Sequence, residues 1–279
     1  MASSHHTRVR RPRSVWFWAV GLALTLSLAQ GIAAVAAVPL SRGPAEVTPG
    51  PTETGKETPL LFVPEPLTDL PPGRPLQEWK EQSSLAFTGM GGNAQVKVRL
   101  FADVKAGDPS QTAEISALLE DGSAVYDLGV VGNYGLRGVT VLSKDVNGDG
   151  RVELVITGGM GASYGERKII GYDQGEKRWR LLLTMGTPWD GDLDGDGKED
   201  MVAVSGGMIP GYVWIYRWNQ DHFEKADVAK STGSSYAYVN RSADGKAFIE
   251  AGQASAAKYY RCQGGKLIEV PKPVGANPQ

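Results

Sequence analysis

A nine-residue acidic pattern that occurs twice constrains the fold of this chain more than any other feature. The pattern D-x-[DN]-x-D-G-x-x-[DE] occupies residues 145–153 and recurs 47 residues later, at 192–200. Each copy runs into an apolar stretch that ends in Gly-Gly-Met, at 158–160 and 206–208. Self-similarity at this period indicates a repeat architecture, and spacings of about 40–50 residues are typical of β-propeller blades.

Weaker units flank the two clear ones. A further step of similar length reaches residues 240–248, where the loop pattern persists but Phe248 replaces the final acid. Residues 85–104 echo 154–173 without an acidic loop before them. With 36 Gly and few helix-forming runs after the N-terminus, we expect an all-β fold with about four four-stranded, blade-like units between 76 and 279. In the second unit the expected strands are 138–144, 153–157, 167–172 and 178–184.

The acidic loops predict a cation site each, because like charges crowded into one turn repel one another unless an ion balances them. Oxygen donors at positions 1, 3, 5 and 9 and a main-chain carbonyl at position 7 surround one hard ion, and glycine at position 6 permits the reversal. Ca²⁺ suits such a cage better than Mg²⁺, which demands tighter geometry. The expected ligands are Asp145, Asn147, Asp149, Glu153 and the main-chain oxygen of Arg151 in the first loop, and Asp192, Asp194, Asp196, Asp200 and the main-chain oxygen of Lys198 in the second.

Two related patterns are not expected to bind calcium. In the loop from Asn240 to Phe248, Ser242 and Phe248 remove two anionic ligands. EF-hand loops share the opening residues, but they need an acid at position 12 and a following helix. Position 12 is Ile156 in the first loop and Ala203 in the second, within strand-like sequence.

Together, the acidic nonapeptide, the apolar strand and the Gly-Gly resemble the FG-GAP/VCBS repeats of the integrin α-chain N-terminal β-propeller family. The resemblance covers residues 138–250 clearly and the flanking units weakly. It implies calcium bound between the first two strands of a blade, and a binding or structural role at the cell surface. Propellers of that family usually have seven blades. Four units leave a small four-bladed ring, an open array of sheets, or completion by a second chain as alternatives.

The N-terminal region predicts export. Four arginines and no acid precede an apolar run at 14–38. This pattern fits a signal peptide cleaved after the Ala-Val-Ala at 34–36, or an uncleaved helix that anchors the chain in a membrane. Residues 39–75 hold ten of the 17 prolines and predict a disordered linker. The expected domains are therefore 1–38, 39–75 and 76–279, with the last at the cell surface or outside the cell.

Charge and motif content narrow the function. Lys and Arg number 29 against 31 Asp and Glu, so nucleic acid is not an expected partner. We expect a protein or carbohydrate partner at the cell surface, with membrane contact only through an uncleaved N-terminal segment. The alternatives are an envelope component without a discrete ligand and a secreted hydrolase with Ser163 of the G-x-S-x-G at 161–165 as nucleophile. Strand-like sequence follows that motif and His222 is the sole histidine after the N-terminus, so we expect no enzyme. The lone Cys262 is expected to be a packed residue.

Overall fold

A computed structural model describes residues 55–74, 77–91, 95–103, 105, 107–253 and 256–274. The chain divides into two units, 1–50 and 51–279, and all described residues belong to the second. The apolar helix expected within 1–38 and residues 39–54 of the expected linker lie outside the described residues. Within the described ranges, no helix is both long and apolar enough to cross a membrane.

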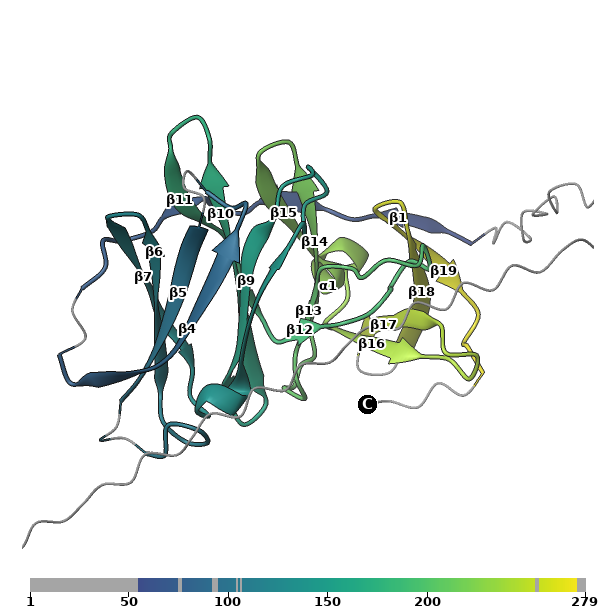
Figure 1. Ribbon diagram of the computed structural model, residues 1–279. Helices are drawn as coiled ribbons and strands as arrows, with labels where there is room; N and C mark the ends of the chain where they lie inside the picture. Colours follow the sequence, from purple (N-terminus) through teal and green to yellow (C-terminus); the bar gives the residue numbers. More distant parts are fainter. Residues whose placement is uncertain are drawn as a thin grey trace, which may run out of the picture. The chain divides into compact units, whose positions relative to one another are not determined.

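Four antiparallel sheets make up the described part, and none of them closes on itself (Figure 1). The first sheet has the order β4 (Trp79–Thr88), β5 (Gln95–Asp103), β6 (Ile115–Asp121), β7 (Ala124–Gly132). The second has the order β8 (Val139–Lys144), β9 (Glu153–Gly161), β10 (Tyr164–Asp173), β11 (Arg178–Gly186), β3 (Thr68–Asp69). The third has the order β12 (Pro188–Trp189), β13 (Val202–Val204), β14 (Val213–Asn219), β15 (His222–Asp227), β2 (Phe62–Pro64).

The fourth sheet has the order β16 (Tyr236–Arg241), β17 (Ala247–Gln253), β18 (Ala256–Gln263), β19 (Lys266–Val270), β1 (Glu57–Pro59). Two short helical segments also occur in the described residues, a 3₁₀ turn at Leu136–Gly138 and α1 at Val228–Thr232. Asp227 caps the N-terminus of α1 by accepting a hydrogen bond from the Lys230 N–H. The all-β prediction is confirmed.

The strands expected in the second unit match β8, β9, β10 and β11, each within a few residues. The turn between β10 and β11 forms because the Asp173 carboxylate accepts hydrogen bonds from the main-chain N–H groups of Gly175 and Glu176. In every sheet the consecutive long strands are neighbours. Apart from the short strands β1, β2 and β3, each sheet is therefore built from a local run of chain.

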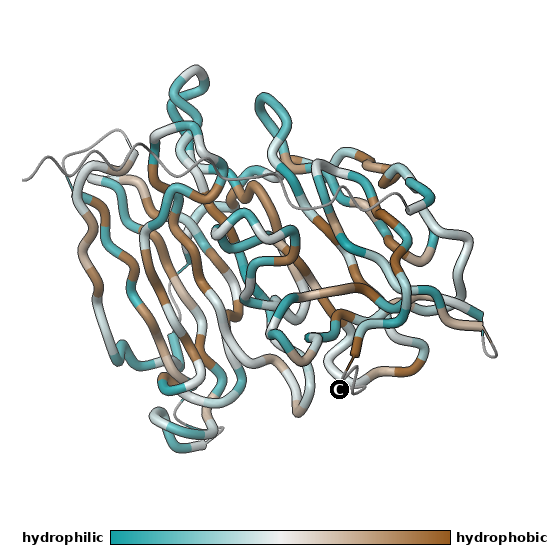
Figure 2. The backbone as a smooth tube through the Cα atoms, turned by 90° about the vertical axis from the view of Figure 1, so that its right-hand side faces the viewer, coloured by the Kyte–Doolittle hydropathy of each residue, from teal (hydrophilic) through white to brown (hydrophobic). Residues whose placement is uncertain are grey.

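Hydrophobic clusters fill the space between successive sheets. Side chains alternate between the two faces of a strand, and Ile170 faces the cluster shared by the first and second sheets while Ile169 faces the next one. The first cluster includes Val98 and Trp179, and the cluster between the third and fourth sheets includes Ile215 and Ile249. Figure 2 shows hydrophobic stretches along the strands and hydrophilic ones in many of the connections. The sheets thus stack in chain order on shared cores.

Charged side chains cover the outer face of the first sheet. Arg99 donates a hydrogen bond of 2.6 Å to Glu120 and another to Glu81, and its guanidinium lies 5.0 Å from the ring centre of the buried Phe101. A further sheet stacked on this face would bury these three charges, which is costly. This charged face is therefore suited to be the outer surface of the first sheet, at the end of the stack.

Residues 55–74 correct the prediction of a disordered linker over 39–75. We call them the N-terminal strap: β1, β2 and β3 pair with β19, β15 and β11, and Pro72 forms a bridge with Tyr126 of β7. Figure 1 shows the strap, at the purple end of the colour scale, running along the sheets. Leu60, Leu67 and Leu70 of the strap reach into the clusters between the sheets, so the folded part begins well before residue 76.

Candidate metal centre

Both acidic loops connect the first two strands of their sheet. The first acidic loop (145–153) follows β8 and leads into β9, where pairing starts at Lys144 opposite Glu153. The second acidic loop (192–200) lies between β12 and β13, where the last pair is Trp189 opposite Val202. The main-chain N–H of Asp200 donates to the carbonyl of Gly191 at 2.9 Å and closes the second loop. The expected placement of the loops within the units is confirmed.

The two loops share one hydrogen-bond network. The side chain at position 1 accepts from the main-chain N–H groups of positions 4 and 6, position 3 accepts from position 5, position 5 from position 7, and position 9 from position 2. The acceptors in the first loop are Asp145, Asn147, Asp149 and Glu153. Those in the second loop are Asp192, Asp194, Asp196 and Asp200. Each loop is therefore held by the same side chains that were expected to bind the ion.

Two glycines in each loop make this network possible. Gly148 and Gly150 have φ of 76° and 84°, and Gly195 and Gly197 have φ of 82° and 85°. Other residues rarely adopt this left-handed region. Glycine is thus required at position 4 as well as at position 6, where the sequence had indicated it.

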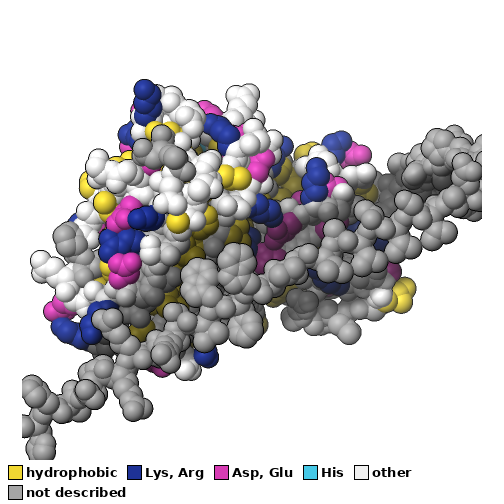
Figure 3. Space-filling model, in the orientation of Figure 1, with side chains coloured by type: hydrophobic (Ala, Val, Ile, Leu, Met, Phe, Trp, Pro, Cys, Tyr) yellow, Lys and Arg dark blue, Asp and Glu magenta, His cyan; other side chains and the backbone are white. Residues whose placement is uncertain are grey.

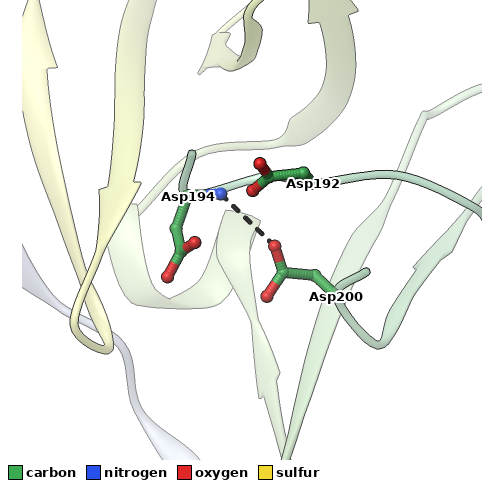
Figure 4. A group of neighbouring side chains, drawn as sticks. All are labelled: Asp192, Asp194 and Asp200. Carbon is green, nitrogen blue, oxygen red and sulfur yellow. Dashed lines mark hydrogen bonds between the residues drawn. The ribbon is translucent and has the colours of Figure 1, made fainter. Parts of the chain in front are cut away.

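In the second loop, three carboxylates converge. Asp192, Asp194 and Asp200 each offer an oxygen, and these oxygens all lie within 4.8 Å of one another (Figure 4). No Lys or Arg of the described residues forms an ion pair with them. Burial, together with the negative charge of the two neighbours, raises the pKa of Asp200. Three facing carboxylates without a counterion are a fitting donor set for a hard divalent cation.

In the first loop, the acids do not converge to that distance. Arg151 holds Asp149 aside through a hydrogen bond of 3.0 Å from Nε to the carboxylate, and this bond lowers the pKa of Asp149. The Asn147 amide donates to the Glu153 carboxylate at 3.3 Å. Glu153 is 4% exposed, and this burial raises its pKa to about 7. The first loop therefore satisfies its own charges in part, and an ion would have to displace Arg151 from Asp149.

Three further expected ligands, Asp196, Arg151 and Lys198, are exposed at the surface of their loops. Asp196 is exposed, and its carboxylate accepts from the Lys198 N–H at 2.7 Å instead of joining the other three acids. Arg151 and Lys198, expected to offer main-chain oxygens, are exposed residues whose N–H groups bond the acid at position 5.

The third loop, at 240–248, has closed into a hairpin. Strand pairing continues through Asn240 opposite Phe248, and the Ser242 N–H donates to the Lys246 carbonyl at 2.9 Å. Phe248 is fully buried, so position 9 has become part of the core. This geometry agrees with the expectation that the third loop binds no ion, which remains a prediction.

No sequence pattern predicted an ion pair that lies beside the two acidic loops. Lys144, at the end of β8, contacts Glu199 of the second loop at 2.5 Å. A groove of 690 Å³ runs beside this pair and is lined by residues of both loops, including Asp145 and Lys198. The end of β8 thus contacts the second acidic loop directly.

The geometry gives the hydrolase alternative no support. Ser163 lies in the two-residue turn between β9 and β10, whereas a nucleophile elbow joins a strand to a helix. His222 begins β15, and its Nδ1 lies 2.7 Å from Asp221 on the same hairpin. Figure 3 shows basic and acidic side chains next to each other over much of the visible surface.

No family model matches the chain, and no curated protein or solved structure matches it either. The resemblance to FG-GAP/VCBS repeats therefore rests on the loop pattern and its spacing.

Proposed function

We propose that this chain is an exported, calcium-stabilised binding or structural module, with a β-propeller-like array of FG-GAP/VCBS type. The observation that carries the proposal is the set of side-chain to main-chain hydrogen bonds that two loops 47 residues apart share, together with the convergence of Asp192, Asp194 and Asp200. An accidental cluster of surface acids would not repeat the same acceptor at each position of two separate loops.

The physical role of the ion is to offset repulsion where a loop joins two strands. Asp200 anchors the loop to the main chain of Leu193, a buried core residue, so charge repulsion in the loop acts directly on the core. Calcium sites in extracellular modules have dissociation constants on the order of 10⁻⁴ M. Calcium at about ten times that concentration would add roughly 1.4 kcal/mol of stability for each site.

Export and partner form the second half of the proposal. The arginine-flanked apolar segment at 14–38 would deliver the chain outside the cytoplasm, as a secreted or anchored protein. There, calcium is abundant enough to fill sites of modest affinity. The stiffened array would present its loops to a protein or carbohydrate at the cell surface.

Thermal unfolding of the full chain, with calcium and with a chelator, tests the metal role. We expect a melting temperature several degrees higher in calcium, and calorimetric titration should detect binding that Mg²⁺ does not reproduce. Asp194→Ala should remove the share of this dependence that belongs to the second loop. Asp244→Ala, an exposed acid in the third loop, is the matched control and should leave it unchanged. Identical melting with calcium and chelator would refute the proposal.

A further inference from the structure

The N-terminal strap contacts all four sheets at the same kind of position. It pairs with the last long strand of each sheet, in the order β19, β15, β11 and β7, which is the reverse of the chain order. β1 and β2 contribute three residue pairs each and β3 contributes two. The strap thus adds a strand to the outer edge of three sheets and a single bridge to the edge of the first.

The strap is anchored by apolar side chains that each pack on a different cluster. Leu60 is 7% exposed and belongs to the cluster between the third and fourth sheets. Leu67 packs on the cluster between the second and third, and Leu70 on the cluster between the first and second. Leu61, next to Leu60, is 55% exposed and packs on no cluster. One side of the strap therefore packs into the clusters between the sheets, while the other side faces solvent.

Each sheet also offers the strap at least one oppositely charged partner. The pairs, from the fourth sheet to the first, are Glu57–Lys266 at 2.7 Å, Glu65–Lys225 at 2.6 Å, Asp69–Arg178 at 2.8 Å and Arg74–Asp127 at 3.6 Å. Such pairs at partly exposed positions contribute little energy individually, but they fix the register of the strap on the edges.

Glycines mark the two ends of the contact. A Cβ on Gly55 would lie 1.8 Å from the Glu269 carbonyl oxygen, and a Cβ on Gly73 would lie 2.4 Å from a methyl group of Val125. Both ends of the strap therefore approach the body more closely than any other residue would allow. Packed leucines, oppositely charged pairs and close main-chain approach therefore fit the strap to the sheets along its whole length.

We propose that the outer edges of the four sheets form one continuous acceptor surface for a proline-interrupted extended peptide, and that the strap of a second copy of this chain is its occupant in trans. The strap lies on the edges and does not thread between strands, so it can leave without opening a sheet. Along the chain, residues 75–78 separate the strap from β4, which starts at Trp79. Exchange between two copies keeps every contact, and this makes a strand-exchanged dimer accessible at low cost.

The first experiment asks whether the strap is a separable ligand. A protease site is inserted between Arg74 and Gln77 of the full chain, and the chain is cut after folding. We expect the two pieces to stay together on size exclusion, and a fluorescent peptide of residues 55–74 to exchange into the cut protein. Immediate loss of the strap with no binding of the peptide would overturn the acceptor surface.

Paired peptide variants test which contacts recognise the strap. Leu60→Ala should weaken binding at least tenfold, because it empties a buried position. Leu61→Ala, one residue away on the exposed side, should bind within twofold of the original peptide. Lys225→Glu in the body should weaken binding about fivefold, and the Glu65→Lys peptide should restore it, which also shows that the variant body is folded. Equal binding by the Leu60→Ala and Leu61→Ala peptides would contradict this mode of recognition.

The second experiment tests the second copy as occupant. Two full chains with different tags are incubated together, and we expect each tag to retrieve the other chain. Excess 55–74 peptide should block this association while the Leu60→Ala peptide should not. Binding of the peptide without any association of the tagged chains would overturn the second copy as occupant. Run with a chelator as well as with calcium, these assays report on the strap separately from the metal proposal.

Discussion

The two acidic loops share a main-chain conformation but differ in how they handle charge. Their glycines have the same φ within about ten degrees, and each acceptor occupies the same position in both. In the first loop, Arg151 and Asn147 provide partners for Asp149 and Glu153. In the second loop, three carboxylates face one another without a basic partner among the described residues.

This difference separates two properties that the acidic motif combines, namely the shape of the loop and its affinity for an ion. The spacing of acids and glycines determines the shape of the loop, because every contact that holds the shape runs from a side chain to the main chain a few residues away. We infer that the residues at positions 3 and 7 set how strongly an ion would be held by the loop. We therefore expect the second loop to bind calcium more tightly than the first.

Removing one charge from each loop should give the largest contrast. Asp192→Asn and Asp145→Asn both remove the charge at position 1. Each also keeps only one of the two acceptor oxygens, and because this loss is the same in both variants they form a matched pair. Asp192→Asn should lower the calcium-dependent gain in melting temperature by about 4 °C, as the loss of roughly 1–2 kcal/mol implies for a unit of this size. Asp145→Asn should lower it by half of that or less.

The contrast is measured by thermal unfolding at fixed calcium, with Asp244→Ala as the reference for a charge change in a loop without an ion. Equal losses from Asp145→Asn and Asp192→Asn would show that Arg151 does not weaken the first loop.

The pH dependence should differ between the ion-free and the ion-bound protein. Burial raises the folded-state pKa of Glu153 from its ordinary value near 4.5 to about 7. The folded state therefore binds an extra proton between these values, so stability in chelator should fall as the pH rises from about 4.5 to 7, by on the order of 1–3 kcal/mol. The raised pKa of Asp200 acts in the same direction. Denaturant titration at several pH values measures this slope.

Glu153→Gln should flatten the slope in chelator, since the amide does not titrate. In saturating calcium the slope should reverse, because the ion competes with the proton for the same oxygens. A slope that is the same in Glu153→Gln as in the original chain would assign the effect to other groups.

The sequence was sufficient for the parts of the fold that depend on near neighbours. The strands β8 to β11 and both acidic loops follow from residues within one unit, where periodicity and turn chemistry act locally. The absence of an ion in the third loop, expected from its lost ligands, stays a prediction. The strap was not predictable from composition, because its order depends on partners such as Lys266, 209 residues from Glu57. The withdrawal of Asp149 onto Arg151 likewise depends on a side-chain conformation that spacing does not encode.

Reciprocal exchange of position 7 should give the smallest effect and the sharpest comparison. Arg151→Lys gives the first loop the residue of the second and removes the planar group that bonds the Asp149 carboxylate. It should raise the calcium affinity of the first loop about threefold, because the ion no longer has to displace that contact. Lys198→Arg should lower the affinity of the second loop by a similar factor, since the new guanidinium is placed to hold Asp196 as Arg151 holds Asp149. Calorimetric titration of each variant, with the other loop silenced by its Asp→Asn change, separates the two sites. If both exchanges leave the affinities unchanged, position 7 does not set the difference and the Asn at position 3 becomes the remaining cause.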